Sequence, residues 1–268
     1  MLLGVSLAGK MQVLAYFLIL LTGVSFGLIG AGGAIIVVPI LVYMLGQTFE
    51  KATGYALPVS MLVSTVGASI AIKQKVVDLK RAVEFGLPTA CISFASRKLI
   101  VPLLPEVMFG WPRKSVMMLA FAFILVGAGI TMIKSKKFVA PEHPHPFAGL
   151  LFGLIIGLFS GIFGIGGGFM IVPVLALFFG LEMKIAVGTS LCSVVMITSF
   201  AFVAEFMNHP DIPWTFVGGI MLVASIGMVI GSQLRQVIDG SKLKTGFGYF
   251  VLLLACTLPV LEIMRLQK

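Results

Sequence analysis

Two glycine-rich stretches of similar sequence contain the residues of this chain best suited to binding a ligand. Each interrupts an apolar stretch and is followed by a proline, at Pro39 or Pro173. A helix that begins after such a break has up to four unpaired backbone N–H groups at the positive end of its dipole. Glycine leaves these groups accessible because it has no Cβ atom. The stretches read Gly27-Leu28-Ile29-Gly30-Ala31-Gly32-Gly33 and Gly161-Ile162-Phe163-Gly164-Ile165-Gly166-Gly167-Gly168. They predict a site for a small oxyanion, with the candidate residues Gly30, Gly32, Gly33, Gly164, Gly166, Gly167 and Gly168.

Close helix packing is the alternative explanation of these glycines, since small residues let membrane helices approach each other. We favour the binding interpretation because the motif occurs twice, is denser than packing requires and is followed by an unusually short apolar segment. A dinucleotide-binding fingerprint is excluded, because neither copy has the strict GxGxxG spacing or follows a strand of a βαβ unit.

Hydroxyl side chains follow both motifs at similar distances. Thr189, Ser190 and Ser193 follow the second motif, and Ser60 follows the first. Their hydroxyl groups can donate hydrogen bonds to sulfonate or carboxylate oxygens. The alternative is that each binds the carbonyl one helical turn earlier, which satisfies Ser and Thr in membranes without any ligand.

Two arginines, Arg97 and Arg235, occupy equivalent places near the ends of apolar segments. Either can steer an anion toward a transport pathway, although snorkelling of the guanidinium to the membrane interface is the simpler explanation. Glu84 and Glu205 lie near segment ends, and no carboxylate lies in the middle of a segment. The sequence therefore indicates no carrier for a buried proton relay.

Composition places the chain among all-α integral membrane proteins. It is 59% hydrophobic and 11% charged, with a mean hydropathy of +1.12, and the charges lie between apolar segments of membrane-spanning length. The net charge of +9 comes from basic residues clustered at segment ends, which indicates membrane topology rather than nucleic-acid binding. The three cysteines form no CxxC pair, so neither a metal site nor a cofactor is expected.

Membrane-spanning helices are expected wherever about 20 apolar residues occur together. Two shorter runs, residues 34–46 and 169–180, directly follow the glycine motifs and are too short to cross as straight helices. The longer runs are residues 11–31, 52–72, 82–104, 114–133, 147–167, 184–206, 214–238 and 244–264.

The chain, residues 1–268, reads as a single transmembrane domain made of two copies of one sequence. A shift of 134 residues aligns Gly30 with Gly164 and Gly46 with Gly180 without a gap. We therefore predict two repeats of about five helical segments each. The first covers residues 11–133, the linker covers 134–146, and the second covers 147–264.

The direction of the two repeats depends on the number of crossings in each. The loop at residues 73–81 is strongly basic, whereas its counterpart at 208–213 contains no Lys or Arg. Because basic loops stay in the cytoplasm, this difference favours inverted repeats, with a broken or re-entrant segment after each glycine motif. Parallel repeats with eight spans are the alternative, and they leave the basic loop at 235–244 outside.

The second glycine motif, followed by Val172-Pro173 and by Ala186-Val187-Gly188-Thr189-Ser190-Leu191, resembles the TauE/SafE family of sulfite and organosulfonate permeases. The resemblance extends over residues 12 to 264 and includes the weaker first copy. It implies a secondary transporter of sulfite, sulfoacetate or other organosulfonates in a bacterial-type inner membrane. The first half differs where Tyr55-Ala56 replaces the Thr-Ser of the family pattern, so the second half is expected to supply more of the ligand contacts.

The function expected from these observations is a permease that binds a small anion near the bilayer midplane and exposes it alternately to either side. An anion channel with the same site, or a membrane scaffold subunit without transport of its own, are the alternatives. An intramembrane enzyme is not supported, because the chain has no HExxH, no GxSG and no mid-span aspartate pair. The expected partners are the anion, the lipid bilayer, a coupling ion such as a proton or sodium, and a second copy in a homodimer.

Overall fold

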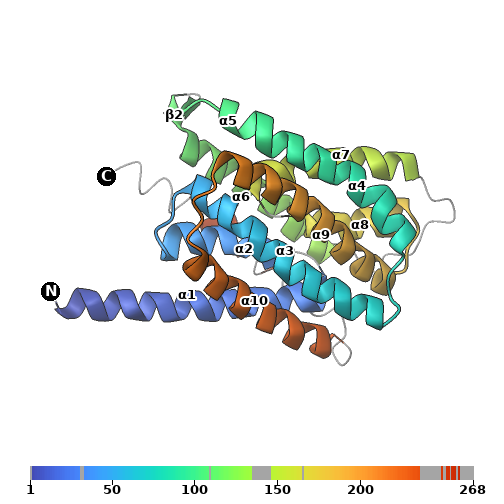
Figure 1. Cartoon of the computed structure of the whole chain (residues 1–268), viewed down its shortest axis with the longest axis horizontal. Helices are drawn as coiled ribbons and strands as arrows, with labels where there is room; N and C mark the ends of the chain where they lie inside the picture. Colours follow the sequence, from blue (N-terminus) through green and yellow to red (C-terminus); the bar gives the residue numbers. More distant parts are fainter. Residues whose placement is uncertain are drawn as a thin grey trace.

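The computed structural model describes residues 2–30, 33–108, 110–134, 146–164, 166–235 and a few positions between 249 and 259 (Figure 1). The linker at 134–146 and the span expected at 244–264 fall largely outside these residues. The helical elements in chain order are α1 (Leu2–Ile29), α2 (Gly33–Pro39), the π-helical η1 (Ile40–Met44), α3 (Phe49–Lys73), α4 (Leu79–Ala95), the π-helical η2 (Ser96–Ile100), α5 (Val101–Leu103), α6 (Arg113–Lys134), α7 (Pro146–Phe163), α8 (Gly168–Phe178), α9 (Met183–Asn208) and α10 (Trp214–Leu234). Strands β1 (Val107–Met108) and β2 (Trp111–Pro112) form a short antiparallel hairpin before α6 that the sequence did not predict.

The described part of the chain is an all-α membrane protein apart from this hairpin. Helices are the expected solution, because a segment in lipid must satisfy its own backbone N–H and C=O groups. Within the described residues, Phe49–Lys73, Lys184–Asn208 and Trp214–Leu234 are long and apolar enough to cross a membrane. Shorter apolar helices cover Gln12–Leu28, Ser115–Gly127 and Gly149–Phe163. These helices lie at spans expected from the sequence.

The apolar stretches break at the glycine motifs. Helix α1 ends at Ile29, and Gly30 follows with a φ of +68°. Helix α7 ends at Phe163, and Gly164 follows with the same φ of +68°. Only glycine adopts this left-handed conformation at no steric cost. The breaks expected from the sequence are therefore present, and a short helix follows each one: α2 with η1 in the first half and α8 in the second.

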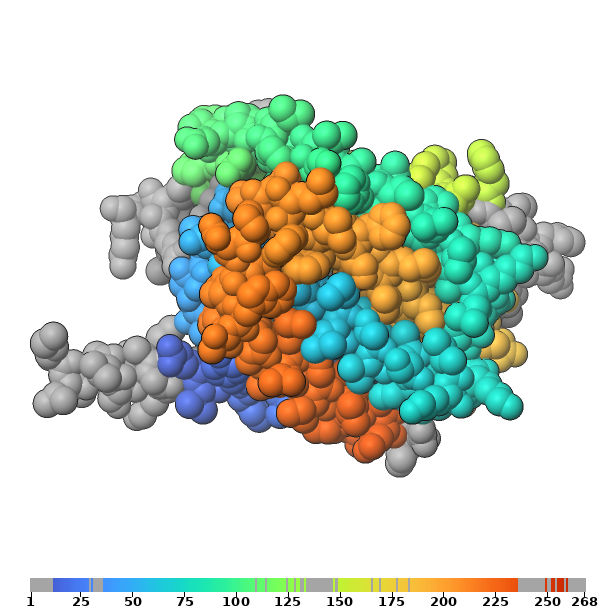
Figure 2. Space-filling view, viewed as in Figure 1, coloured from blue at the N-terminus to red at the C-terminus, as the bar shows by residue number. Residues whose placement is uncertain are grey.

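The central pair of helices, α3 and α9, runs in opposite directions through the middle of the molecule (Figure 1). Gly54, near the start of α3, lies beside Glu205, near the end of α9. Gly188, near the start of α9, lies beside Val76, which follows the end of α3. Figure 2 shows α3, α9, α10 and α4 packed side by side on one face. The start of each central helix thus lies beside the end of the other.

The outer helices pack in two crossed pairs, one on each side of the central pair (Figure 1). Helix α1 lies on α10, with Gly23 against the backbone of Ala224. Helix α7 lies on α4, with Gly157 against the backbone of Thr89. These glycines allow the backbones to touch, as small residues do between membrane helices. Each outer pair joins one helix from each half of the chain.

Candidate functional site

A cavity of about 570 Å³ opens at one end of the molecule. The start of α3, the end of α9 and the loop that follows α9 form most of its wall, and η2, α5 and the start of α6 complete it. This volume is typical of pockets for small molecules. The lining residues are Thr48, Glu50, Lys51, Gly54, Tyr55, Arg97, Val101, Pro102, Arg113, Glu205, Asn208, His209, Pro210, Asp211 and Ile212.

A buried ion pair lies in the wall of this cavity. Arg97 Nε donates to Glu205 Oε2 over 2.7 Å, although the two residues are 108 positions apart in the chain. Arg97 is only 2% exposed and Glu205 only 7%. Buried charges are stable only when they are paired and hydrogen-bonded. The expectation that Arg97 snorkels to the membrane interface is therefore wrong, because its guanidinium points inward to Glu205.

The other donors of Arg97 connect the cavity to the second glycine motif. Arg97 Nη1 lies 3.1 Å from Thr53 Oγ1, 3.4 Å from the Gly161 carbonyl oxygen and 3.3 Å from the Ile162 carbonyl oxygen. These two carbonyls belong to the last turn of α7, where carbonyl groups lack helical partners and the dipole is negative. The guanidinium therefore caps the C-terminal end of α7, directly before the helix break at Gly164.

Local backbone structure also positions Arg97. It lies in η2, a π-helical turn in which the N–H of Val101 bonds the carbonyl of Ser96. Pro102 follows in the first turn of α5, where its missing N–H is tolerated. Such π turns are rare and frequently occur at functional sites.

Arg235 holds the corresponding position at the opposite end of the molecule. It follows α10, as Arg97 follows α4, and its Nη2 donates to Gln74 Oε1 over 3.1 Å. Its Nη1 is buried without a hydrogen-bond partner among the described residues. Burial lowers the pKa of Arg235 from its ordinary value, yet a guanidinium stays charged at neutral pH. Arg97 thus pairs with a carboxylate, and Arg235 with a neutral amide.

The motif glycines are closely packed rather than open to a cavity in this conformation. A Cβ atom on Gly164 would meet the Thr53 backbone, and one on Gly30 would meet Val187. Gly166 lies against Thr198, and Gly167 against Ile156. Gly33 and Gly168 begin α2 and α8, and Gly32 lies outside the described residues. The packing explanation therefore accounts for the four contacts named here, and their binding role stays a prediction.

The hydroxyls of the second half are satisfied by the backbone. Ser190 Oγ donates to the carbonyls of Val187 at 2.8 Å and Gly30 at 3.1 Å. Ser193 Oγ lies 3.2 Å from the Thr189 and Ala82 carbonyl oxygens. Thr189 Oγ1 accepts from the backbone N–H of Asp78 at 2.9 Å. These contacts match the alternative of bonding to helix carbonyls for Ser190 and Ser193, and they join the two halves.

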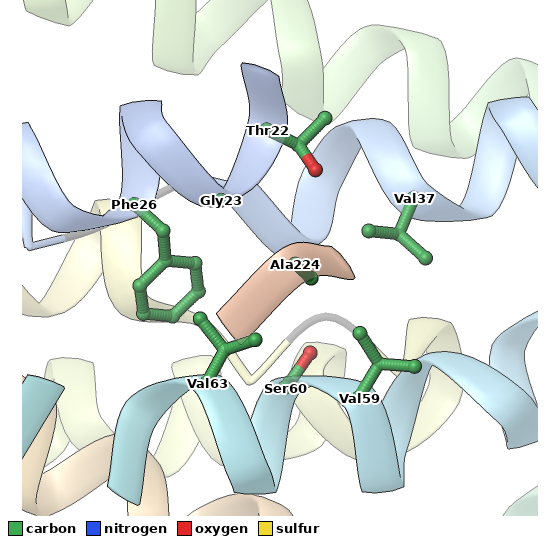
Figure 3. Close-up of a pocket in the computed structure, with 8 residues that line it drawn as sticks. All are labelled: Thr22, Gly23, Phe26, Val37, Val59, Ser60, Val63 and Ala224. Carbon is green, nitrogen blue, oxygen red and sulfur yellow. The ribbon is translucent and has the colours of Figure 1, made fainter. Parts of the chain in front are cut away.

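Ser60 is different, because its buried hydroxyl has no hydrogen-bond partner among the described residues. It points from α3 into a small cavity between α1, α2, α3 and α10, which Thr22 and Val37 also line (Figure 3). The cavity volume is about 10 Å³, which is close to the minimum for one water molecule. The cavity is therefore too small for an oxyanion in this conformation.

The match to known proteins extends over most of the chain. The model of the family described as sulfite exporter TauE/SafE matches residues 15–258. This chain belongs to the TauE/SafE family. No solved structure matches it.

Relatives of this TauE/SafE protein carry names that agree with the fold. A probable membrane transporter protein of Haemophilus influenzae is 28% identical over 257 residues, which cover 88% of this chain and 93% of the relative. The probable membrane transporter protein YunE of Bacillus subtilis is 27% identical over 258 residues, 89% of this chain and 94% of its own. A probable membrane transporter protein of Xylella fastidiosa is 28% identical over 249 residues, which cover 88% of this chain and 90% of the relative. The family and these names indicate a multi-pass membrane transporter rather than an enzyme.

Sequence reasoning missed Glu205 as a partner for Arg97 in this TauE/SafE protein. The signal was present in the helical spacing. Glu205 follows the buried residues Thr198 and Ala201 on one face of α9. Arg97, in η2, follows the buried Ser93 of α4 by four residues. A charge that continues a buried helical face near a span end predicts an inward partner.

Proposed function

We propose that this protein is a secondary transporter of small sulfur-containing oxyanions, such as sulfite, sulfoacetate or other organosulfonates, and that it works by alternating access. The observation that carries the proposal is the buried guanidinium of Arg97 in the wall of a 570 Å³ cavity. A guanidinium presents five N–H donors in a fixed plane and binds planar or tetrahedral oxyanions with two bonds at once. The sulfur-containing substrate class is supported by family membership.

A helix start near Arg97 favours an anion over a cation. The second glycine break separates Arg97's carbonyl partners in α7 from the start of α8 at Gly168. Gly167 precedes α8 in a left-handed conformation and provides no side-chain cap, so the first N–H groups of this 11-residue helix and its positive dipole end favour negative charge. We propose that this end, with its counterpart after Gly30, binds the anion near the bilayer midplane once the glycine contacts loosen.

The two halves are proposed to be inverted repeats. The contacts that support this are reciprocal: Gly164 lies against Thr53, and Gly30 lies against Val187, which follows Thr53 by 134 residues. The opposite directions of α3 and α9 also support it. In repeats of this kind, each half adopts one of two conformations. Access alternates when the two halves exchange these conformations.

We infer the side on which the cavity opens from the charge of the loops. The cavity is lined by the loop residues 209–212, and the strongly basic loop 73–81 lies at the other end of α3. Since basic loops stay in the cytoplasm, we propose that the structure is open to the outside of a bacterial-type inner membrane. An anion arriving from outside would then reach Arg97 first.

The test uses purified protein in liposomes loaded with unlabelled anion. Labelled sulfite, thiosulfate, sulfoacetate, sulfate and a short carboxylate are added outside in parallel. A secondary transporter takes up the labelled substrate faster when unlabelled substrate is inside, because exchange avoids the return of the empty carrier. A channel shows flux without this stimulation, and a scaffold subunit shows no flux for any anion; either result would overturn the proposal.

A further inference from the structure

We propose that Glu205 competes with the substrate anion for Arg97, and that protonation of Glu205 admits the anion, so that one proton enters with each anion. This inference rests on the proposed function. It names the coupling ion as a proton and assigns Glu205 as the residue that carries it. The carboxylate occupies Arg97 Nε over 2.7 Å, and both residues line the cavity.

Competition follows from the donor arrangement of Arg97. Its Nη1 is directed to Thr53 Oγ1 and the carbonyls of Gly161 and Ile162. The Nε donor, on the other edge of the guanidinium, faces Glu205. An oxyanion that binds this edge must take the position of the Glu205 carboxylate, and an ionised carboxylate there repels it.

The charges balance in both states of the cavity. With Glu205 ionised, the Arg97–Glu205 pair is neutral and stable without substrate. With Glu205 protonated, Arg97 is left with an uncompensated positive charge, and a bound oxyanion supplies the negative charge that Glu205 has lost. The proton is held on a Glu205 carboxyl oxygen while the anion accepts the Arg97 N–H bonds, so proton and anion are bound in the same conformation and released together.

A path for the proton is present at the cavity wall. His209 Nδ1 lies 3.5 Å from Glu205 Oε1, whereas Arg97 Nε contacts the other carboxylate oxygen, Oε2. The His209 side chain is 71% exposed, whereas that of Glu205 is 10% exposed. Histidine exchanges protons near neutral pH. It therefore connects the buried carboxylate with solvent in the cavity.

The remaining ionisable groups around Glu205 come from each neighbouring element. Tyr55 in α3 is near enough to interact electrostatically with Glu205. Farther along the cavity wall, Glu50 pairs with Arg113 at 3.2 Å. The other charged lining residues are Lys51 and Asp211. Among the described residues named here, Arg97 and His209 are in direct polar contact with the Glu205 carboxylate.

At the opposite end of the molecule, the described residues place an amide beside the corresponding arginine. Arg235 Nη2 donates to the neutral side chain of Gln74. An amide does not ionise, so a proton switch is present at one end alone within the described residues. This asymmetry ties proton binding to the cavity that opens beside the loop 209–212.

The first experiment measures protons bound with the anion. Thiosulfate is titrated into the full-length protein in detergent by calorimetry, in two buffers of different ionisation enthalpy, from about pH 5.5 to about 8, where thiosulfate stays fully ionised. We expect about one proton taken up per anion bound, and an affinity that falls about tenfold per pH unit while Glu205 is ionised. Binding of thiosulfate without proton uptake would overturn the inference but leave the transport proposal standing.

The second experiment uses the Glu205→Gln variant, which has nearly the shape of the protonated side chain. Its thiosulfate affinity should be independent of pH, and exchange of labelled for unlabelled thiosulfate should persist in liposomes. Accumulation driven by a pH gradient should be lost. If Glu205 had a merely structural role, the variant would lose exchange and accumulation together, and that result would overturn the inference. Accumulation of thiosulfate by Glu205→Gln in response to a pH gradient would also overturn it.

A matched control is Glu84→Gln. Glu84 is an exposed carboxylate that pairs with Arg81 over 2.8 Å outside the cavity. Its replacement should leave both proton uptake and gradient-driven accumulation unchanged. If Glu205→Gln does not fold, the calorimetric result on the unmodified protein still decides the inference. Absence of both binding and exchange for every anion in the panel would instead overturn the transport proposal itself.

Discussion

The backbone carbonyl of Thr53 in α3 lies so close to Gly164, the residue that follows the end of α7, that a Cβ atom on Gly164 would overlap it. The side chain of the same threonine accepts a hydrogen bond from Arg97. One residue of the central helix thus touches both the helix break and the buried guanidinium. The helix break and the cavity are thus connected through one residue of α3.

Replacement of Gly164 by alanine should destabilise the protein for two reasons. The φ of +68° is unfavourable for alanine by about 1 kcal/mol, and the added methyl overlaps the Thr53 backbone, which costs about a further 1 to 3 kcal/mol. Gly46 is the matched control, since it has a φ of +66° but nothing within 4 Å of its added Cβ. Thermal unfolding in detergent should therefore show a clearly larger loss for Gly164→Ala than for Gly46→Ala. Equal losses would show that the break is not held by packing against α3.

Loss of the Arg97 side chain should be strongly destabilising. Arg97→Gln leaves the buried Glu205 carboxylate without its guanidinium, and breaking one side of a buried pair costs about 3 to 5 kcal/mol. The double variant Arg97→Gln with Glu205→Gln removes both charges and should recover part of this loss. A double-mutant cycle of unfolding free energies measures the coupling. If the two single losses simply add, the ion pair does not contribute to the fold.

The sequence predicted the helical breaks but not the ion pair. Gly30 and Gly164 were identified because glycine is informative by itself: an apolar run cannot continue unchanged through several glycines. The Arg97–Glu205 pair depends on how α4 and α9 pack, and no local pattern joins residues 108 positions apart. The helical position of Ser190 could likewise be predicted from the sequence. Its hydrogen bond to Gly30 could not, because it depends on how one half packs on the other.

The two buried serines provide a contrasting pair. Ser190→Ala removes hydrogen bonds to Val187 and Gly30 and should lower the free energy of unfolding by about 1 kcal/mol. Ser60→Ala removes a buried hydroxyl without a partner in the described residues, so stability should stay the same or rise slightly. Thermal unfolding without added anion compares them. A large loss for Ser60→Ala would mean that its hydroxyl bonds a bound water or another group.

Inverted repeats predict opposite sides for two equivalent loops. In a background without native cysteines, Lys75→Cys should react with a membrane-impermeant maleimide only after the cells are permeabilised, and Asp211→Cys should react in intact cells. Both positions lie in loops, at the turn after α3 and the segment after α9. Labelling of both from the same side would support parallel repeats.

The central claim, that Arg97 binds the transported oxyanion, is tested most directly by exchange of labelled sulfoacetate in liposomes. The unmodified protein is compared with Arg97→Gln/Glu205→Gln, in which no buried charge is left unpaired, so that a folded protein can be assayed. The account predicts uptake that is stimulated by unlabelled sulfoacetate inside and is lost in the double variant. Equal exchange by the two proteins would contradict it.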